Sequence, residues 1–121
     1  MTTPKPPYAV MFTSDAKAEV QSLDASTKGR LRKILGQKIA VQPEQYGTPL
    51  RGSLAGYWKH EFASHRVLYR IYPDDKLVVV CAVGARKGSH RRDVYRQLEA
   101  LARSGRLAER LLAVLKSFAP P

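Results

Sequence analysis

Short apolar runs and longer segments of helical periodicity alternate along the first third of the chain. Residues 8–13 (YAVMFT) are apolar and partly β-branched, which is typical of a buried strand. Ser14 and Asp15 follow as candidate caps for a first helix over residues 16–23. Residues 27–41 are predicted to form a second helix with one face toward a core, because apolar residues recur there every three or four positions, at Leu31, Ile34, Leu35 and Ile39.

Three strand-like runs follow a loop, residues 42–54, that is rich in Pro, Gly and polar residues. They span residues 57–62, 65–72 and 76–83, and tight turns join them. The last run contains the sequence LVVVCAV, which is apolar throughout. Such a run predicts a strand that is buried on both faces near the centre of a sheet.

A basic loop and two apolar stripes make up the rest of the chain. The loop covers residues 84–92, and the first helical stripe after it is interrupted at Ser104-Gly105. A second stripe of leucines predicts an additional C-terminal helix over residues 106–119, and the stripe permits either packing on this domain or a dimer contact. The order β-α-α-β-β-β-α plus this helix predicts a single α+β domain over residues 1–121, in which helices pack on a mostly antiparallel sheet. Residues 1–7 are expected to be a flexible tail.

The chain is strongly basic. Lys and Arg number 21 against 10 Asp and Glu, so the formal net charge is +11, and the sequence pI is about 10.2. Such a surface favours a polyanionic partner, nucleic acid first and an acidic protein second. We expect no membrane partner and a cytoplasmic protein, because no apolar run approaches the roughly 20 residues of a spanning helix and the N-terminus carries no secretory signal. Cys81 is the only cysteine, so an intrachain disulfide is excluded, and its apolar neighbours predict a core residue.

A turn at residues 63–64 determines how the first two of the three strands pair. Glu61 then lies opposite Arg66 and Lys59 lies opposite Leu68, and directly opposed residues point to the same face of a sheet. One face of this hairpin therefore carries the charged side chains. The other is the better core face, and it carries Trp58, His60, Phe62, Val67, Tyr69 and Ile71.

A turn at residues 73–75 brings the end of the third strand back beside the start of the second. Arg86 is therefore predicted to lie near Glu61 and Arg66, and Tyr95 could reach the same place from the helix that follows. Several cations near one tyrosine suit a site that holds a phosphate group. The alternative interpretation is a solvated face on which Glu61 and Arg66 form a simple cross-strand ion pair.

Several short motifs make the chain similar to a known family. They are Leu50-Arg51-Gly52, Tyr57-Trp58-Lys59, Arg66-Val67-Leu68-Tyr69-Arg70, and Val83-Gly84 with Arg86. On these motifs the chain resembles the RelE/ParE toxin superfamily of type II toxin–antitoxin systems over residues 8–101. The resemblance implies a RelE-like toxin fold. It also implies one of two activities, because RelE-type members are ribosome-dependent endoribonucleases that cut mRNA, whereas ParE-like members inhibit DNA gyrase.

The resemblance implies catalytic roles for Lys59, Arg66, Arg86 and Tyr95, and the chemistry of the residues adds Glu61 as a further candidate. The residues expected to contact the RNA are Arg51, Arg70, Lys87, His90, Arg91 and Arg92. No metal and no other cofactor is expected, because the family reaction is an attack of the RNA 2′-hydroxyl on the adjacent phosphate.

The chain departs from the family pattern at three places. Glu61 stands where the family has a second strand lysine, which removes a cation and adds an anion. The basic loop is longer, with residues 87–92 inserted after the loop arginine. Thr48 stands where another branch of the family has a glutamate, so the acid–base scheme of that branch does not transfer directly.

The expected residue roles follow from the chemistry of phosphate cleavage. Arg66 and Arg86 can hold the charge that develops on the phosphate oxygens. Lys59 and Glu61 are the two candidate general bases, and the choice between them stays open. Tyr95 could stack on an exposed base of the RNA.

We therefore expect a type II toxin that cuts mRNA on the ribosome. Its expected partners are a cognate antitoxin protein, with which it forms a hetero-oligomer, the ribosome and mRNA. Two alternatives remain open. One is a ParE-like toxin that inhibits DNA gyrase and cuts nothing, and the other is a non-toxic RNA-binding relative.

Overall fold

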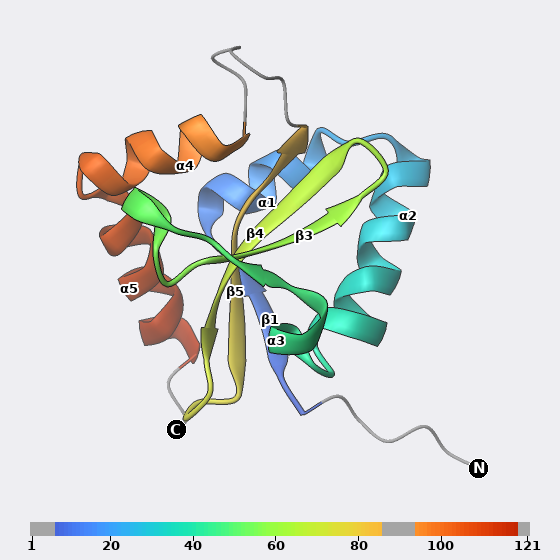
Figure 1. The fold of residues 1–121 in the computed structure, drawn as a ribbon, viewed down its shortest axis with the longest axis horizontal. Coiled ribbons are helices and arrows are strands. Elements are labelled where there is room, and N and C mark those ends of the chain that lie inside the picture. Colours follow the sequence, from blue (N-terminus) through green and yellow to red (C-terminus); the bar gives the residue numbers. More distant parts are fainter. Residues whose placement is uncertain (1–6, 86–93, 119–121) are drawn as a thin grey trace.

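The computed structural model describes residues 7–85 and 94–118, which form an α+β domain (Figure 1). The strands are β1 (Ala9–Phe12), β2 (Thr48–Pro49), β3 (Trp58–Phe62), β4 (His65–Tyr72) and β5 (Leu77–Ala85). The helices are α1 (Ser14–Gln21), α2 (Ala25–Ile34), α3 (Pro43–Tyr46), α4 (Val94–Arg103) and α5 (Arg106–Phe118). The predicted fold class, helices packed on a mostly antiparallel sheet, is confirmed.

The strands lie in the order β1-β5-β4-β3-β2. β1 runs parallel to β5, and the other neighbours are antiparallel. The strand that was predicted to be central, β5, has neighbours on both sides, and Leu77 to Val83 are all buried. Continuous burial of this kind explains why its sequence does not alternate between apolar and polar residues.

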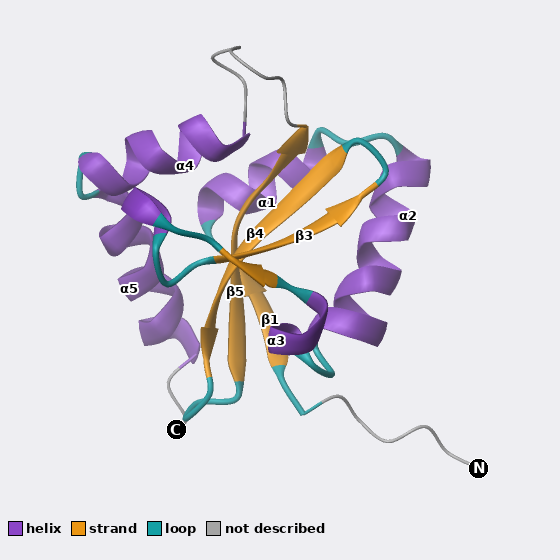
Figure 2. Cartoon of the chain, viewed as in Figure 1, coloured by secondary structure: helices purple, strands orange, loops and turns teal. Residues whose placement is uncertain are grey.

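Helices cover both faces of the sheet, with α2 on the right of the strands and α4 and α5 on the left in Figure 2. One cluster of buried side chains lies under α1 and α2 and contains Leu31, Leu35, Ile39, Phe62, Val67, Tyr69, Val78 and Val80. The second cluster lies under α4 and α5 and contains Tyr57, Leu68, Val79, Cys81, Leu98, Leu107 and Leu111. The predicted core face is therefore the α1/α2 side, but the opposite face is also covered around Leu68.

A β-bulge sits in the middle of β5. Leu68 pairs with Ala82 and Tyr69 pairs with Val80, so that Cys81 is an extra residue between two pairs. Both Cys81 and Ala82 belong to the cluster under α4 and α5. Burial raises the pKa of the Cys81 thiol to about 12, so the prediction of an inert core cysteine agrees with the structure.

The two N-terminal helices begin at capping side chains. Thr13 Oγ1 accepts a hydrogen bond from the Ala16 N–H at 3.2 Å, so Thr13 caps α1 in place of the predicted Ser14 and Asp15. Asp24 caps α2 by accepting from the Thr27 N–H at 2.6 Å, and this N–H lowers the pKa of the Asp24 carboxyl. The predicted second helix does not continue as an α-helix to residue 41, because a π-helical turn spans Leu35–Ile39.

The segment that was predicted as a loop contains α3, β2 and a 3₁₀ turn at Gly52–Leu54. α3 is held by Tyr69, whose hydroxyl donates to the Pro43 carbonyl at 2.6 Å. Gly47 is required beside this bond, because a Cβ at that position would lie 2.0 Å from the Tyr69 hydroxyl oxygen. β2 is short and contains Pro49, as suits the edge of a sheet.

The C-terminal helix packs on the domain. Leu107, Leu111 and Val114 of α5 are buried in the cluster beneath it. Gly105 adopts φ +80 between α4 and α5, a conformation that glycine accepts without strain. Over the described chain, no helix has the length and apolar character needed to cross a membrane.

Candidate functional site

The β3–β4 hairpin has the predicted register. Glu61 pairs with Arg66 and Lys59 pairs with Leu68. On the other side of β4, Arg66 pairs with Gly84 of β5. Glu61, Arg66 and Gly84 therefore form one row across three strands, and Lys59 lies in the next row on the same face.

One carboxylate oxygen joins the two cations of this face. Glu61 Oε1 lies 3.3 Å from Lys59 Nζ and 3.2 Å from Arg66 Nε. The side chain of Arg66 is only 15% exposed, that of Lys59 is 27% exposed and that of Glu61 is 49% exposed. Arg66 is further fixed by its Nη1, which donates to the His65 carbonyl at 3.0 Å. We call Lys59, Glu61 and Arg66 the hairpin cluster.

The start of α4 lies against the same end of β5. A Cβ added to Gly84 would lie 3.5 Å from Cβ of Val94, the first residue of the helix. Tyr95 follows, and its partly buried side chain packs against the cluster under α4 and α5. Tyr95 is thus placed on the helix that begins beside the strand partner of Arg66.

Arg51 is exposed and lies apart from the hairpin cluster. It precedes the 3₁₀ turn at Gly52–Leu54, just beyond the point where the Leu50 N–H donates to the Tyr57 carbonyl at 2.8 Å. Since β2 and β3 are antiparallel, this position is beside the start of β3, whereas Glu61 is near the end of that strand.

Arg70 shares the face of the hairpin cluster but not its location. It lies four residues after Arg66 on β4, a separation of roughly 13 Å along a strand. Its guanidinium lies over the rings of Tyr57 and Tyr72, with distances of 5.4 Å and 5.6 Å to the centroids. Through these cation–π contacts Arg70 packs against two tyrosines.

Five of the predicted site residues lie outside the described residues. They are Arg86, Lys87, His90, Arg91 and Arg92. The structure therefore brings together Lys59, Glu61 and Arg66, places Tyr95 at the start of the neighbouring helix, and separates Arg51 and Arg70 from them.

Two side chains before and within α1 support the part of β5 that carries Gly84. β1 pairs with β5 only as far as Val80. Beyond that point, Thr13 Oγ1 donates to the Cys81 carbonyl at 3.4 Å, and the Val83 N–H donates to Glu19 Oε1 at 3.2 Å. The sequence contains no signal for this role of Glu19, because it depends on how α1 lies across the sheet.

The environment of Glu19 disfavours its charged form. Burial raises the pKa of the Glu19 carboxyl to about 7, against the lowering effect of the Val83 N–H, and the neighbouring Asp15 raises it further. Asp15 itself faces Arg110 of α5, with 2.9 Å between Oδ2 and Nε. The end of β5 is thus held by a carboxyl that titrates near neutral pH.

The arrangement of the hairpin cluster can bind a phosphate group. Two fixed cations share one carboxylate, so an anion that replaces or joins Glu61 would meet both a guanidinium and an ammonium group. Within residues 7–85 and 94–118, no three His, Cys, Asp or Glu side chains gather in a way that would hold a metal ion.

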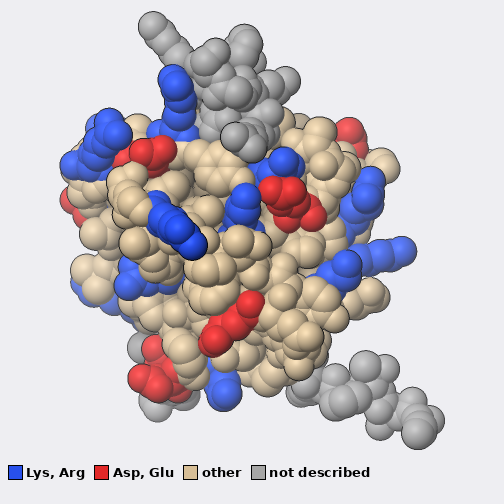
Figure 3. Space-filling model, in the orientation of Figure 1, with Lys and Arg blue, Asp and Glu red and all other residues tan. Residues whose placement is uncertain are grey.

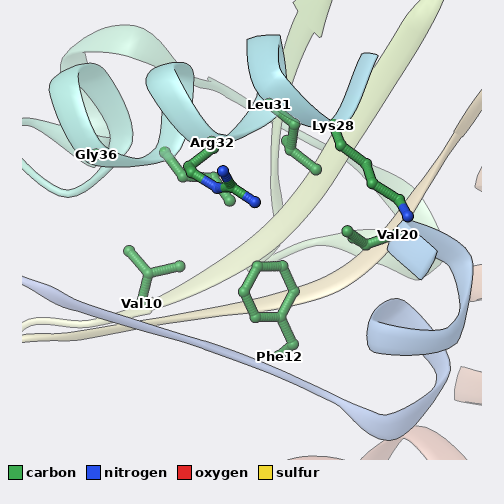
Figure 4. A pocket seen from close by; sticks show the side chains of 8 residues that line it. Val10, Phe12, Val20, Lys28, Leu31, Arg32 and Gly36 are labelled. Carbon is green, nitrogen blue, oxygen red and sulfur yellow. The ribbon is translucent and has the colours of Figure 1, made fainter. Parts of the chain in front are cut away.

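Charged side chains lie in several areas of the face shown in Figure 3. Lys and Arg side chains lie over α2 at the right of the view, and other cations lie beside acidic side chains near the upper centre. Between β1, α1 and α2 there is an apolar pocket of about 280 Å³, lined by Val10, Phe12, Val20, Leu31 and Leu35 with Lys28 and Arg32. Figure 4 shows the ring of Phe12 and the side chains of Val10 and Val20 around this space, and the two cationic side chains come from α2.

Known proteins resemble this chain in sequence. The sequence profile of the ParE toxins of type II toxin–antitoxin systems (parDE) matches residues 10–90. Toxin RelG of Mycobacterium tuberculosis is 31% identical over 91 residues, which make up 75% of this chain and 99% of RelG.

Solved structures resemble it in fold. The toxin–antitoxin complex RelBE2 of Mycobacterium tuberculosis contains a chain with a TM-score of 0.63 and 28% identity, and the match covers 70% of this chain and 98% of that one. The intact RelBE toxin–antitoxin complex of E. coli gives a TM-score of 0.57 and 25% identity, with 66% of this chain and 98% of the other covered. The predicted RelE-like toxin fold is therefore confirmed.

Proposed function

Because this chain belongs to the RelE/ParE superfamily of toxins from type II toxin–antitoxin systems, we propose that it is a ribosome-dependent endoribonuclease that cuts mRNA. The observation that supports this activity best is the hairpin cluster, in which Lys59 and Arg66 converge on one oxygen of Glu61. Two fixed cations around one anion provide the electrostatic environment that phosphoryl chemistry requires.

The proposed reaction is an in-line displacement at a phosphate of the mRNA. The 2′-hydroxyl loses its proton to a general base and its oxygen attacks the adjacent phosphorus. The bond from phosphorus to the 5′-oxygen breaks, and that oxygen takes up a proton from water, so the products carry a 2′,3′-cyclic phosphate and a 5′-hydroxyl. Arg66 donates to the non-bridging oxygens, where negative charge grows in the transition state.

Two versions of this mechanism differ in the role of Glu61. In the first, Glu61 is the general base and Lys59 holds the phosphate together with Arg66. In the second, the phosphate displaces the Glu61 carboxylate from Arg66, and Lys59 accepts the proton as a neutral amine. Both versions remain part of the proposal, because Lys59 and Glu61 are both exposed enough to meet a substrate.

The remaining predicted residues have proposed roles near this cluster. Tyr95 stacks on a base next to the scissile phosphate, and its place at the start of α4 beside Gly84 supports this assignment. Arg86 acts with Arg66 on the phosphate. Lys87, His90, Arg91 and Arg92, together with Arg51, bind RNA further from the reaction, and Arg70, which packs on two tyrosines, contributes least.

A cognate antitoxin is the proposed protein partner. The two solved relatives with the RelE-like fold described above are parts of toxin–antitoxin complexes. The net charge of +11 favours an antitoxin segment rich in acidic residues, which would compete with RNA for the same surface. We expect the toxin to be inactive in such a hetero-oligomer in the cytoplasm.

Expression without an antitoxin tests the proposed activity. We expect the wild-type chain to stop growth and to produce new mRNA 5′ ends inside translated codons. The Arg66→Ala and Arg86→Ala variants should do neither, whereas the control Arg103→Ala, which changes an arginine with a 76% exposed side chain on α4, should act like wild type. Unchanged toxicity of the Arg66→Ala variant would refute the proposed role of Arg66 in binding the phosphate.

A second candidate function is inhibition of DNA gyrase without nucleic-acid cleavage. It is favoured by the match to the ParE profile and by the anion at position 61, which reduces the positive charge of the hairpin cluster. Growth arrest with intact mRNA and an induced DNA-damage response would support this reading. An RNA-binding protein without toxicity would cause neither effect.

A further inference from the structure

The helix α2 and the turn after it carry an unbalanced positive charge. Residues 25–42 contain no acidic residue and five cations, at Lys28, Arg30, Arg32, Lys33 and Lys38. A solvated helix usually offsets such cations with carboxylates three or four residues away. The ion pairs between described residues include none of these five side chains.

Three of these cations face a groove beside the sheet. Arg30, Lys33 and Lys38 line one side of a cavity of about 460 Å³, and residues 60–63 at the end of β3 line the other. Arg30 and Lys33 are one helical turn apart, so their side chains lie on the same face of α2. Lys38 Nζ lies over the ring of Tyr46, at 5.8 Å from the ring centroid. We call this space the α2–β3 groove.

The α2–β3 groove adjoins the hairpin cluster. Glu61 lines the groove and also contacts Lys59 and Arg66. β2 pairs only with Trp58 and Lys59, so β2 does not pair with the outer edge of β3 from His60 onward. Edge backbone groups and cationic side chains therefore border the same space.

This composition favours a nucleic-acid backbone over a protein segment. Peptide recognition in a groove relies on apolar anchors. The pocket of Val10, Phe12 and Leu31 offers such anchors. Among the residues that line the α2–β3 groove, the large apolar side chains are those of Ile34 and Phe62. Phosphate contacts rely on Lys, Arg, amide side chains and backbone N–H groups instead. Gln37 adds an amide to the cations on the groove wall.

We propose that the α2–β3 groove is a second RNA contact surface, which binds backbone phosphates of the single strand that enters the hairpin cluster. The inference rests on the proposed function, because it takes RNA as the substrate. It adds phosphate-binding cations on α2 and on the π-helical turn after it, none of which is assigned to the reaction. Arg30, Lys33 and Lys38 each contact one phosphate, and the strand continues from there past Glu61 to Arg66.

The size of the effect follows from counterion release. For single strands, each phosphate contact contributes about 0.7 to the slope of log affinity against log salt concentration. Loss of three contacts should lower the slope by about 2, which amounts to about a 100-fold weaker affinity at about 0.1 M salt.

The test compares two triple variants with the same net charge. The groove variant is Arg30→Gln/Lys33→Gln/Lys38→Gln, and the control is Lys17→Gln/Lys28→Gln/Arg32→Gln, whose residues line the apolar surfaces around β1, α1 and α2. The probe is a fluorescent single-stranded oligonucleotide of 2′-O-methyl RNA, which has no 2′-hydroxyl and cannot be cut. Fluorescence anisotropy over a salt series gives affinity and slope, and circular dichroism checks that both variants fold.

We expect the groove variant to lose about 100-fold in affinity and the control to lose several-fold at most, through long-range charge alone. Equal losses in the two variants would overturn the proposal. It would also be overturned if the groove variant kept its RNA affinity and lost only binding to a polyglutamate peptide, since the groove would then serve an acidic protein.

Cleavage of ribosome-bound mRNA separates this inference from the proposed function. If wild-type protein cuts mRNA and the groove variant binds the oligonucleotide like the control, the groove proposal fails alone. If wild-type protein cuts nothing and the groove variant still loses oligonucleotide affinity, the nuclease fails and the groove stands.

Discussion

Glu19 is placed where its carboxyl is costly to ionise. Its Oε1 accepts a hydrogen bond from the Val83 N–H at 3.2 Å, next to the strand residue that pairs with Arg66. Burial is the main reason why the pKa of the Glu19 carboxyl rises from 4.5 to about 7. We expect the substitution Glu19→Gln to keep an acceptor for Val83 and to remove the ionisation.

The raised pKa determines the direction of the effect. The folded protein binds the Glu19 proton more tightly than the unfolded chain does, so this contribution to stability is fully present below about pH 4.5 and is lost as the pH rises through about 7. The full shift corresponds to at most about 3 kcal/mol, since one pKa unit is worth about 1.4 kcal/mol. Because the side chain is partly exposed, solvent screening reduces the expected value to about 1–2 kcal/mol.

Urea unfolding at two pH values measures this effect. We expect wild type and Glu19→Gln to have similar free energies of unfolding at pH 5, and the variant to be more stable by about 1–2 kcal/mol at pH 8. All other titrating groups are common to both proteins, so their contributions cancel in the difference. A difference that stays constant from pH 5 to pH 8 would refute the reasoning.

Three further substitutions test other contacts. Glu61→Gln should tighten binding of single-stranded RNA by about fivefold in anisotropy titrations, because it removes an anion worth about 1 kcal/mol from beside Lys59 and Arg66. Cleavage that survives this substitution would exclude Glu61 as the general base. Tyr69→Phe should lower the free energy of unfolding by about 1 kcal/mol, because the Pro43 carbonyl loses its donor, and an unchanged urea midpoint would contradict that role. Leu107→Ala should cost about 2–4 kcal/mol in the same assay through the cavity that it leaves under α5, and a loss below about 1 kcal/mol would mean that α5 is not docked as described.

The β3–β4 hairpin was predictable because local rules decide it. A turn at residues 63–64 and a side-chain period of two determine that Glu61 meets Arg66, and both hold in the structure. The same rules placed Arg70 on the correct face. They did not show that Tyr57 and Tyr72 hold its guanidinium, since that depends on packing around the neighbouring strands.

The elements that were missed depend on contacts between distant residues. α3 is held by Tyr69, which is 26 residues away from Pro43, and β2 forms against β3 although only two residues pair. The β-bulge at Cys81 of β5 could not be predicted, because the apolar run that contains it is uninterrupted. The role of Glu19 depends on the position of α1 beside Val83, which no local pattern in the sequence indicates.

The covered second face of the sheet was partly visible in the sequence. Leucine stripes in α4 and α5 indicated two helices that needed an apolar surface, and Leu68 supplies part of it. The prediction assigned this face to charged residues because Lys59, Glu61 and Arg66 alternate along the hairpin. In the structure the hairpin cluster lies at one end of this face, and α4 and α5 cover the rest.

Product chemistry in a purified system tests the central claim most directly. Ribosomes carrying a defined mRNA are mixed with the wild-type chain or with Arg66→Ala, and the ends of the fragments are identified. We predict fragments with a 2′,3′-cyclic phosphate and a 5′-hydroxyl for wild type, and intact mRNA for Arg66→Ala at equal protein concentration. Intact mRNA with the wild-type chain, or the same fragments with Arg66→Ala, would contradict the account.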